Sequence, residues 1–138
     1  MRYLAIDLGA KRTGIATGDD TTGLATPIDV ITTTSDAERL NRLAKLIDEH
    51  GPDALVLGMP LNMDGSPGPA AKHAQAFADQ LTQRFNLPVH PVDERLSSDA
   101  ANRQMAQTGL THKQKKARRD ALAAAVILQD FLNSKRTP

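Results

Sequence analysis

The sequence contains no cysteine and no tryptophan, one tyrosine and three phenylalanines, and no apolar stretch long enough to cross a membrane. Without cysteine, the chain forms neither a disulfide framework nor a thiolate zinc site. The shortage of aromatic rings leaves little surface for stacking unpaired bases, which argues against sequence-specific reading of single strands. Because nothing resembles a signal peptide either, we expect a cytoplasmic protein.

What the chain does contain fits one globular domain. It has 138 residues, of which 40% are apolar and 24% charged. A chain of this length buries about two-thirds of its unfolded surface, and a second full domain has no room. We therefore expect a single domain over residues 1–138.

The net charge of +1 conceals an uneven distribution along the sequence. Residues 1–94 hold 8 basic and 13 acidic side chains, whereas residues 95–138 hold 9 and 3. The second of these ranges contains a dense cluster of basic side chains, which would attract phosphate backbones and give salt-dependent affinity. The alternative is a solvated helix start. The cluster consists of Lys113, Lys115, Lys116, Arg118 and Arg119.

Hydrophobic periodicity and capping signals predict an alternating order of strands and helices. The first two strands flank a glycine-bounded turn, which favours a hairpin. The first helix opens with a capping box, Ser35 to Glu38, and ends at Gly51. Strands are expected at 3–8, 14–18, 27–32, 54–58 and 87–93, and helices at 36–50, 70–85, 97–109 and 113–133.

This order predicts an α/β protein with a five-stranded mixed sheet flanked by helices, as in the ribonuclease H-like fold. The first strand should be central and buried on both faces. Two helices carry apolar stripes that would pack on the sheet. These stripes are Ala37, Leu40, Leu43, Ala44 and Ile47 in the first helix, and Ala70, Ala74, Phe77, Leu81 and Phe85 in the second.

The first strand carries one carboxylate, Asp7, at its end. Burying it without a partner would cost several kcal/mol, so a metal ion, a cation or hydrogen-bond donors must meet it. Alternation places Tyr3, Ala5 and Asp7 on one face and the intervening residues on the other. A partner for Asp7 must therefore approach from that face.

The last helix offers such a partner in Asp120. Its position shares a stripe with Ala124, Ile127 and Phe131, and neighbouring alanines permit close approach to the sheet. Two carboxylates close together raise one pKa unless a divalent cation neutralises them, so Mg²⁺ or Mn²⁺ is the expected ligand. The alternative for Asp120 alone is a first-turn acid favoured by the helix dipole.

A third acid follows the fifth strand, where Asp93 and Glu94 are adjacent. Alternation puts them on opposite faces, so only one can join Asp7 and Asp120, and the residues leave this choice open. The alternative is a surface salt bridge to Arg95.

Basic and histidine side chains near these acids are candidates for substrate contacts. Lys11 and Arg12, in the turn beside Asp7, are placed to hold a flanking phosphate or stabilise developing charge, unless the turn is merely solvated. The 58–69 loop and the 103–119 segment would wall a nucleic-acid groove. His73 could face this groove, although a lone helix histidine is more often simply exposed.

Four sequence blocks together resemble the YqgF family, also called RuvX, over nearly the whole chain. They are Asp7-Leu8-Gly9 with 11–16, Gly58-Met59-Pro60-Leu61 to Gly65, Asp93-Glu94-Arg95-Leu96-Ser97, and Asp120 to Ala124 with Ile127-Leu128. Each block is weak alone, but four in order are specific. The resemblance implies a ribonuclease H-like protein related to RuvC resolvases, with Asp7, Glu94 and Asp120 as catalytic and metal-binding acids, which favours Glu94 over Asp93.

The resemblance also implies a function, the 5′-end maturation of the small-subunit (16S) rRNA precursor, with Holliday junction resolution as the family's older label. Two bound ions would generate hydroxide and stabilise the leaving oxygen, with Asp7 bridging them. The expected partner is nucleic acid, structured RNA before branched DNA, and no membrane. A homodimer is the expectation for a junction resolvase.

Two rival functions come from other classes. An actin-like ATPase also ends its first strand in Asp-x-Gly, but such proteins close two domains around the nucleotide, and this chain has room for one. A non-catalytic RNA-binding assembly factor would keep the fold and use the acids for structure. In that case Asp7→Asn would leave function intact.

Overall fold

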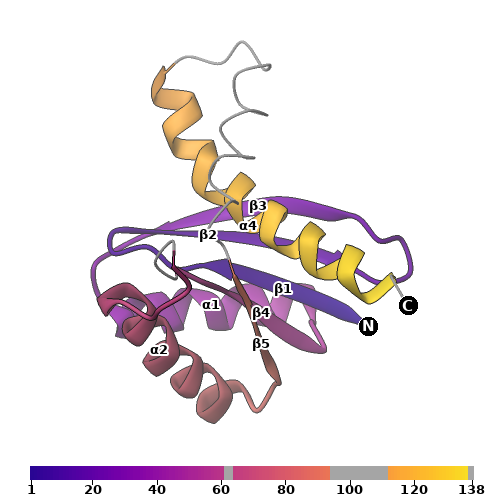
Figure 1. Cartoon of the computed structure of the whole chain (residues 1–138), viewed down its shortest axis with the longest axis horizontal. Helices are drawn as coiled ribbons and strands as arrows, with labels where there is room; N and C mark the ends of the chain where they lie inside the picture. The colour runs from indigo at the N-terminus through magenta and orange to yellow at the C-terminus, as the bar shows by residue number, and fades with distance from the viewer. Residues whose placement is uncertain (61–63, 94–111, 137–138) are drawn as a thin grey trace.

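The computed structural model describes residues 1–60, 64–93 and 112–136, and its centre is a five-stranded sheet in the order β3-β2-β1-β4-β5 (Figure 1). β1 is central, as predicted. The strands are β1 (Arg2–Asp7), β2 (Arg12–Asp19), β3 (Ala25–Thr32), β4 (Ala54–Met59) and β5 (Val89–Asp93).

The sheet is mixed because its two halves are connected differently. β1, β2 and β3 are joined by short turns and pair antiparallel, whereas β1, β4 and β5 are separated by helices and pair parallel. The predicted hairpin of the first two strands is confirmed, with Arg2 opposite Asp19 and Asp7 opposite Gly14. The parallel strands β1, β4 and β5 therefore end at the same edge of the sheet.

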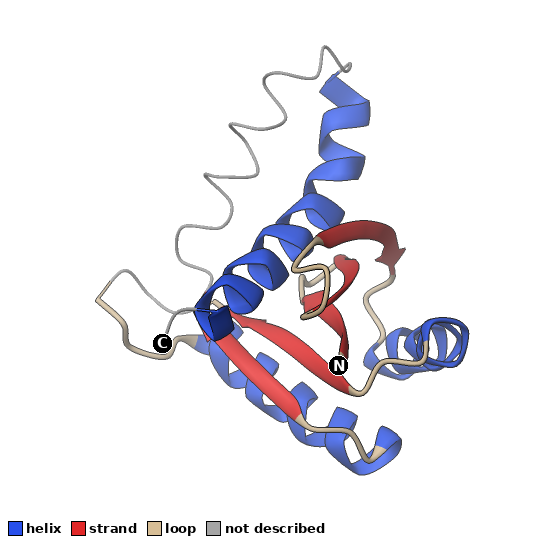
Figure 2. Cartoon of the chain, turned by 90° about the vertical axis from the view of Figure 1, so that its right-hand side faces the viewer, coloured by secondary structure: helices blue, strands red, loops and turns tan. Residues whose placement is uncertain are grey.

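The helices cover both faces of the sheet. α1 (Asp36–His50) and α2 (Pro69–Phe85) lie on one face, and α4 (His112–Arg136) lies across the other (Figures 1 and 2). α1 begins as predicted, since Ser35 Oγ accepts a hydrogen bond from the Glu38 N–H, and it ends at Gly51 with φ of 57°. The first turns of α4 project beyond the sheet (Figure 1).

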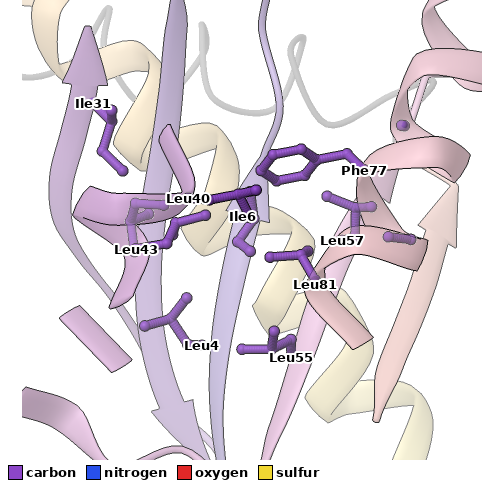
Figure 3. Packing of buried hydrophobic residues seen from close by; sticks show 12 residues of the cluster. Leu4, Ile6, Ile31, Leu40, Leu43, Leu55, Leu57, Phe77 and Leu81 are labelled. Carbon is purple, nitrogen blue, oxygen red and sulfur yellow. The ribbon is translucent and has the colours of Figure 1, made fainter. Parts of the chain in front are cut away.

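Each face of the sheet has its own hydrophobic cluster. On the α1 and α2 face, Phe77 and Leu81 point at Ile6, Leu55 and Leu57 (Figure 3). On the other face, small residues let α4 approach the sheet closely. That cluster includes Tyr3, Ala5, Ala16, Val56, Ala124, Ala125, Ile127, Leu128 and Leu132.

The structure corrects the predicted stripes at two positions. Ala37 and Ala70 are exposed, whereas Arg39 and Ala71 are buried. Arg39 is 1% exposed, so α1 buries a charged side chain where the sequence pattern predicted only apolar ones. The helix predicted at 97–109 lies outside the described residues.

Both edge strands contain a proline. Pro27 lies in β3 and Pro91 in β5, and both side chains are exposed. Proline has no backbone N–H and cannot donate to a further strand, so it interrupts each edge. Among the described residues, no helix is long and apolar enough to span a membrane.

Candidate active site

Asp7 lies at the carboxyl end of the central strand, on the face covered by α4. Tyr3 and Ala5 belong to the α4-side cluster, while Leu4 and Ile6 belong to the opposite one. The predicted alternation of β1 is therefore confirmed, and Asp7 continues the α4-side series. Its side chain is partly exposed at the sheet edge.

Gly14 brings α4 to this end of the sheet. It lies opposite Asp7 in the β1–β2 ladder, and a Cβ atom built on it would lie 1.7 Å from the Asp120 carbonyl oxygen. No residue other than glycine fits between β2 and the helix backbone here. The backbone of Asp120 therefore rests against the strand neighbour of Asp7, as the inward-facing stripe of the last helix predicts.

Arg12 is paired with Asp120. The Arg12 Nε lies 3.0 Å from the Asp120 Oδ2, with side chains 35% and 25% exposed. The oxygen itself is buried, and the contact is ionic rather than a well-aligned hydrogen bond. The positively charged guanidinium of Arg12 therefore lies against this carboxylate, so the Arg12 side chain points into the site.

The two candidates for a third acid, Asp93 and Glu94, come at the end of β5, which lies two strands from β1. Val92 packs with the α4-side cluster, so the next residue, Asp93, belongs to the opposite face from Asp7. Asp93 is also exposed. Glu94, the other candidate, lies outside the described residues.

The structure describes the remaining predicted substrate contacts to different extents. Lys11 is exposed in the turn between β1 and β2. The basic cluster lies on the first two turns of α4, where the structure describes the helix but not the side chains. His73 does not stand alone, because its Nε2 lies 2.9 Å from the Asp36 Oδ2.

The donor chemistry of this edge suits a hard divalent cation. Asp7 and Asp120 supply carboxylate oxygens, the ligands that Mg²⁺ prefers, although the Arg12 guanidinium pairs with Asp120 in the structure. Within residues 1–60, 64–93 and 112–136, no group of three acidic or histidine side chains could hold a metal. The described part of the site therefore provides two acids.

Comparison with known proteins identifies the family. A sequence model described as "RuvX: Holliday junction resolvase" matches residues 1–134. This chain belongs to the RuvX family. A relative from Roseiflexus sp. (strain RS-1), named "Putative pre-16S rRNA nuclease", is 42% identical over 98% of this chain and 96% of its own. A Geobacillus kaustophilus (strain HTA426) protein of the same name is 43% identical over 99% and 100%.

Solved structures show the fold of this RuvX chain. The fowlpox virus resolvase bound to Holliday junction DNA has a TM-score of 0.63 and 15% identity, covering 99% of this chain and 100% of the other. T. thermophilus RuvC in complex with a Holliday junction substrate gives 0.61 and 15%, with 98% and 95% covered. The predicted ribonuclease H-like fold is confirmed.

Two residues at this RuvX site were not predicted from the sequence. Gly14 carried a signal, since a glycine inside a strand often marks close approach of another backbone. Arg39 carried none, because an arginine in an amphipathic helix normally faces solvent. Its contacts place it behind the turn that joins Asp7 to Arg12.

Proposed function

We propose that this RuvX chain is a metal-dependent nuclease that hydrolyses phosphodiester bonds in the 5′-end maturation of the 16S rRNA precursor, in the cytoplasm. The names of its relatives support the reaction and the substrate. The observation that carries the proposal is the contact of Asp120 with Gly14, which brings a second acid to the end of the strand that holds Asp7.

Asp7, Asp120 and Glu94 are the proposed metal ligands. Asp7 ends the central strand and the Asp120 backbone reaches its strand partner Gly14, so these two acids would hold the ions together with Glu94. Glu94 is preferred to Asp93 because Asp93 belongs to the opposite face of the sheet. When bound, two Mg²⁺ or Mn²⁺ ions supply an activated water and stabilise the leaving oxygen in an in-line displacement.

The basic residues hold the substrate in this proposal. Arg12, which pairs with Asp120 in the structure, would hold a substrate phosphate beside Lys11 when Asp120 serves as a metal ligand. The basic cluster lies on the first turns of α4, which extend beyond the sheet (Figure 1). There it would follow a phosphate backbone. Its members are Lys113, Lys115, Lys116, Arg118 and Arg119. Recognition would rest on backbone and shape rather than on base stacking.

Junction resolution is the second candidate, because the matching family model is described as a Holliday junction resolvase. A resolvase would act as a two-fold dimer that cuts both strands symmetrically. The same carboxylates would perform the same hydrolysis, so the substrate distinguishes the two candidates.

The test measures cleavage of a 16S rRNA precursor and a four-way DNA junction side by side, with Mn²⁺ or Mg²⁺. Asp7→Asn and Asp120→Asn should each abolish cleavage, and titration calorimetry should show weaker Mn²⁺ binding. Asp130→Asn is the matched control, since Asp130 is exposed on the same helix and should leave both unchanged.

Each outcome has a distinct meaning. Metal-dependent cutting of the RNA that is lost in Asp7→Asn supports the proposal, and cutting of the junction alone supports the resolvase. No cutting of either substrate, with nucleic-acid binding retained in wild type and Asp7→Asn, would instead assign a non-catalytic assembly factor.

A further inference from the structure

Arg39 is the most deeply buried charged side chain among the described residues, and its contacts converge on one turn. Its Nη2 donates to the carbonyl oxygens of Gly9 and Ala10, both at 3.1 Å, and of Thr33 at 2.9 Å. Nη2 carries only two hydrogens, so one is shared between two of these oxygens. Arg39 therefore holds the backbone that follows Asp7.

The second nitrogen of the guanidinium links this turn to α2. Arg39 Nη1 contacts Asp36 Oδ1, and Asp36 Oδ2 in turn lies 2.9 Å from His73 Nε2. Asp36 neutralises the charge of Arg39, so the guanidinium supplies geometry to the turn without adding net positive charge beside a cation site. We call Arg39, Asp36 and His73 the clamp.

The turn held by the clamp connects two groups of the proposed site. It begins two residues after Asp7 and ends at Arg12, whose guanidinium meets Asp120. Thr33 holds the same turn from outside, because its N–H donates to the Lys11 carbonyl oxygen at 2.9 Å. The path of this turn thus sets how Asp7 ends its strand and where Arg12 begins the next.

A purely structural role would not require this arrangement. Ala10 is an exposed residue of a surface turn, whereas burying a guanidinium against it carries a desolvation cost. A buried arginine with several backbone acceptors instead restricts the turn to one conformation, as outer partners of metal ligands do in other proteins.

We propose that Arg39 is a positioning residue for metal binding at Asp7, that it acts by fixing the 9–12 turn, and that Asp36 and His73 hold it in place. This inference rests on the proposed function. The hydrogen bonds of Arg39 go to Asp36 and to the carbonyl oxygens of Gly9, Ala10 and Thr33, so its effect passes through the turn.

The test replaces Arg39 with lysine, which keeps the charge but cannot serve Asp36 and three carbonyl oxygens together. Arg84→Lys is the matched control, because Arg84 also bridges α1 and α2, donating to Asn41 Oδ1 at 2.9 Å, with no contact to the turn. Both proteins are measured for Mn²⁺ affinity by calorimetry, for kcat and KM at saturating Mn²⁺, and for amide hydrogen exchange of the turn.

Arg39→Lys should weaken Mn²⁺ binding by about tenfold or more, lower kcat similarly and leave KM within about twofold. Exchange at the turn should accelerate without metal present. Arg84→Lys should change none of these by more than about twofold. Unchanged Mn²⁺ affinity and kcat in a folded Arg39→Lys protein would overturn the proposal and leave Arg39 a structural residue.

A second variant covers the case in which Arg39→Lys does not fold. Asp36→Asn removes the neutralising charge from a partly exposed position and should weaken Mn²⁺ binding in the same direction, by about threefold. An unchanged Mn²⁺ affinity in this variant would also overturn the proposal. Two failures can be told apart. Wild type that binds no Mn²⁺ contradicts the proposed function. An unchanged rate of amide hydrogen exchange at the turn in Arg39→Lys contradicts the role of the clamp.

Discussion

At the scale of single residues, the site depends on one atom that is missing. Gly14 has no Cβ, and this absence lets the Asp120 carbonyl group rest on β2 directly beside Asp7. The approach is closer than any side chain permits, so the geometry of the two acids follows from a backbone contact rather than from side-chain packing.

Gly14→Ala should therefore displace α4 and separate the two acids. We expect a loss of at least about 2 kcal/mol in the free energy of unfolding, from overpacking, together with a loss of Mn²⁺ binding. Gly51→Ala is the control, because Gly51 has open space around its Cβ position and only a left-handed φ. It should cost about 1 kcal/mol and leave Mn²⁺ binding intact. Denaturant unfolding and calorimetry measure both quantities, and equal Mn²⁺ affinities in the two variants would contradict this account.

Arg12 occupies the carboxylate that a metal would need. Removing its charge should raise Mn²⁺ affinity, so we expect Arg12→Gln to bind Mn²⁺ about threefold to tenfold more tightly while nucleic-acid binding weakens. Lys11→Gln removes the same charge from an exposed neighbour, for which the structure gives no ion pair with Asp120, and should change Mn²⁺ affinity less. Calorimetry at low salt compares the two, and identical Mn²⁺ affinities would show that the Arg12 ion pair does not compete with metal.

At the scale of elements, polar contacts as well as apolar packing hold α4 on the sheet. Gln129 accepts from the Ala25 N–H at 3.1 Å and donates to the Gly23 carbonyl oxygen at 2.8 Å, which ties the helix to the β2–β3 turn. That turn is closed from within by Asp19, whose Oδ1 accepts from the Thr22 N–H at 2.7 Å. The turn thus helps to hold α4 in place over the sheet.

The backbone hydrogen bond from Thr22 lowers the pKa of Asp19 below its usual range. A carboxyl with a depressed pKa in the folded state adds stability above its unfolded pKa of about 4, and this contribution is lost as pH falls through the folded value. Wild type should therefore be more stable than Asp19→Asn at pH 7, and the difference should shrink below about pH 4. Urea unfolding across this range measures it.

Asp19→Ala serves as the companion variant for that series. It removes the acceptor oxygen as well as the charge, whereas asparagine keeps an oxygen for the Thr22 N–H. Its deficit should include a part that does not change with pH. A wild-type advantage that grows as pH falls would have the wrong sign for a depressed pKa.

The elements themselves were predictable from the sequence because each carries local signals. Period-two alternation in β1, the capping box at Ser35 and the glycine at residue 51 all act within a few residues, and the structure confirms them. The clamp was not predictable, since Arg39 meets Gly9 and Ala10 across a long stretch of chain. The periodicity of hydrophobic residues along a helix does not predict a contact between residues so far apart in the sequence. The roles of Asp7, Glu94 and Asp120 as metal ligands remain predictions.

At the scale of the whole molecule, charge is distributed unevenly along the chain. The basic cluster lies at the start of α4, beyond the sheet, while residues 1–94 carry the acidic excess. We expect the basic cluster to attract nucleic acid to the start of α4 and the affinity to fall with added salt.

Lys115→Ala/Lys116→Ala should weaken binding of every nucleic acid alike and reduce the slope of log K against log salt by about 2. Lys45→Ala/Lys72→Ala is matched in charge, on helices that cover the opposite face, and should leave the slope nearly unchanged. Fluorescence anisotropy between low and moderate salt gives both slopes. If the nucleic-acid affinity of wild type did not change with salt, the basic cluster would be refuted as the binding site.

The position of α4 determines when the site is completed during synthesis on the ribosome. Asp7 is made long before Asp120, and the Asp120 backbone reaches Gly14, the strand partner of Asp7, only when α4 docks on the sheet. A partly synthesised chain would carry the first carboxylate without the second. In the proposed mechanism, a nascent or prematurely released chain that lacks α4 cannot cut nucleic acid, and activity begins only after α4 has been made.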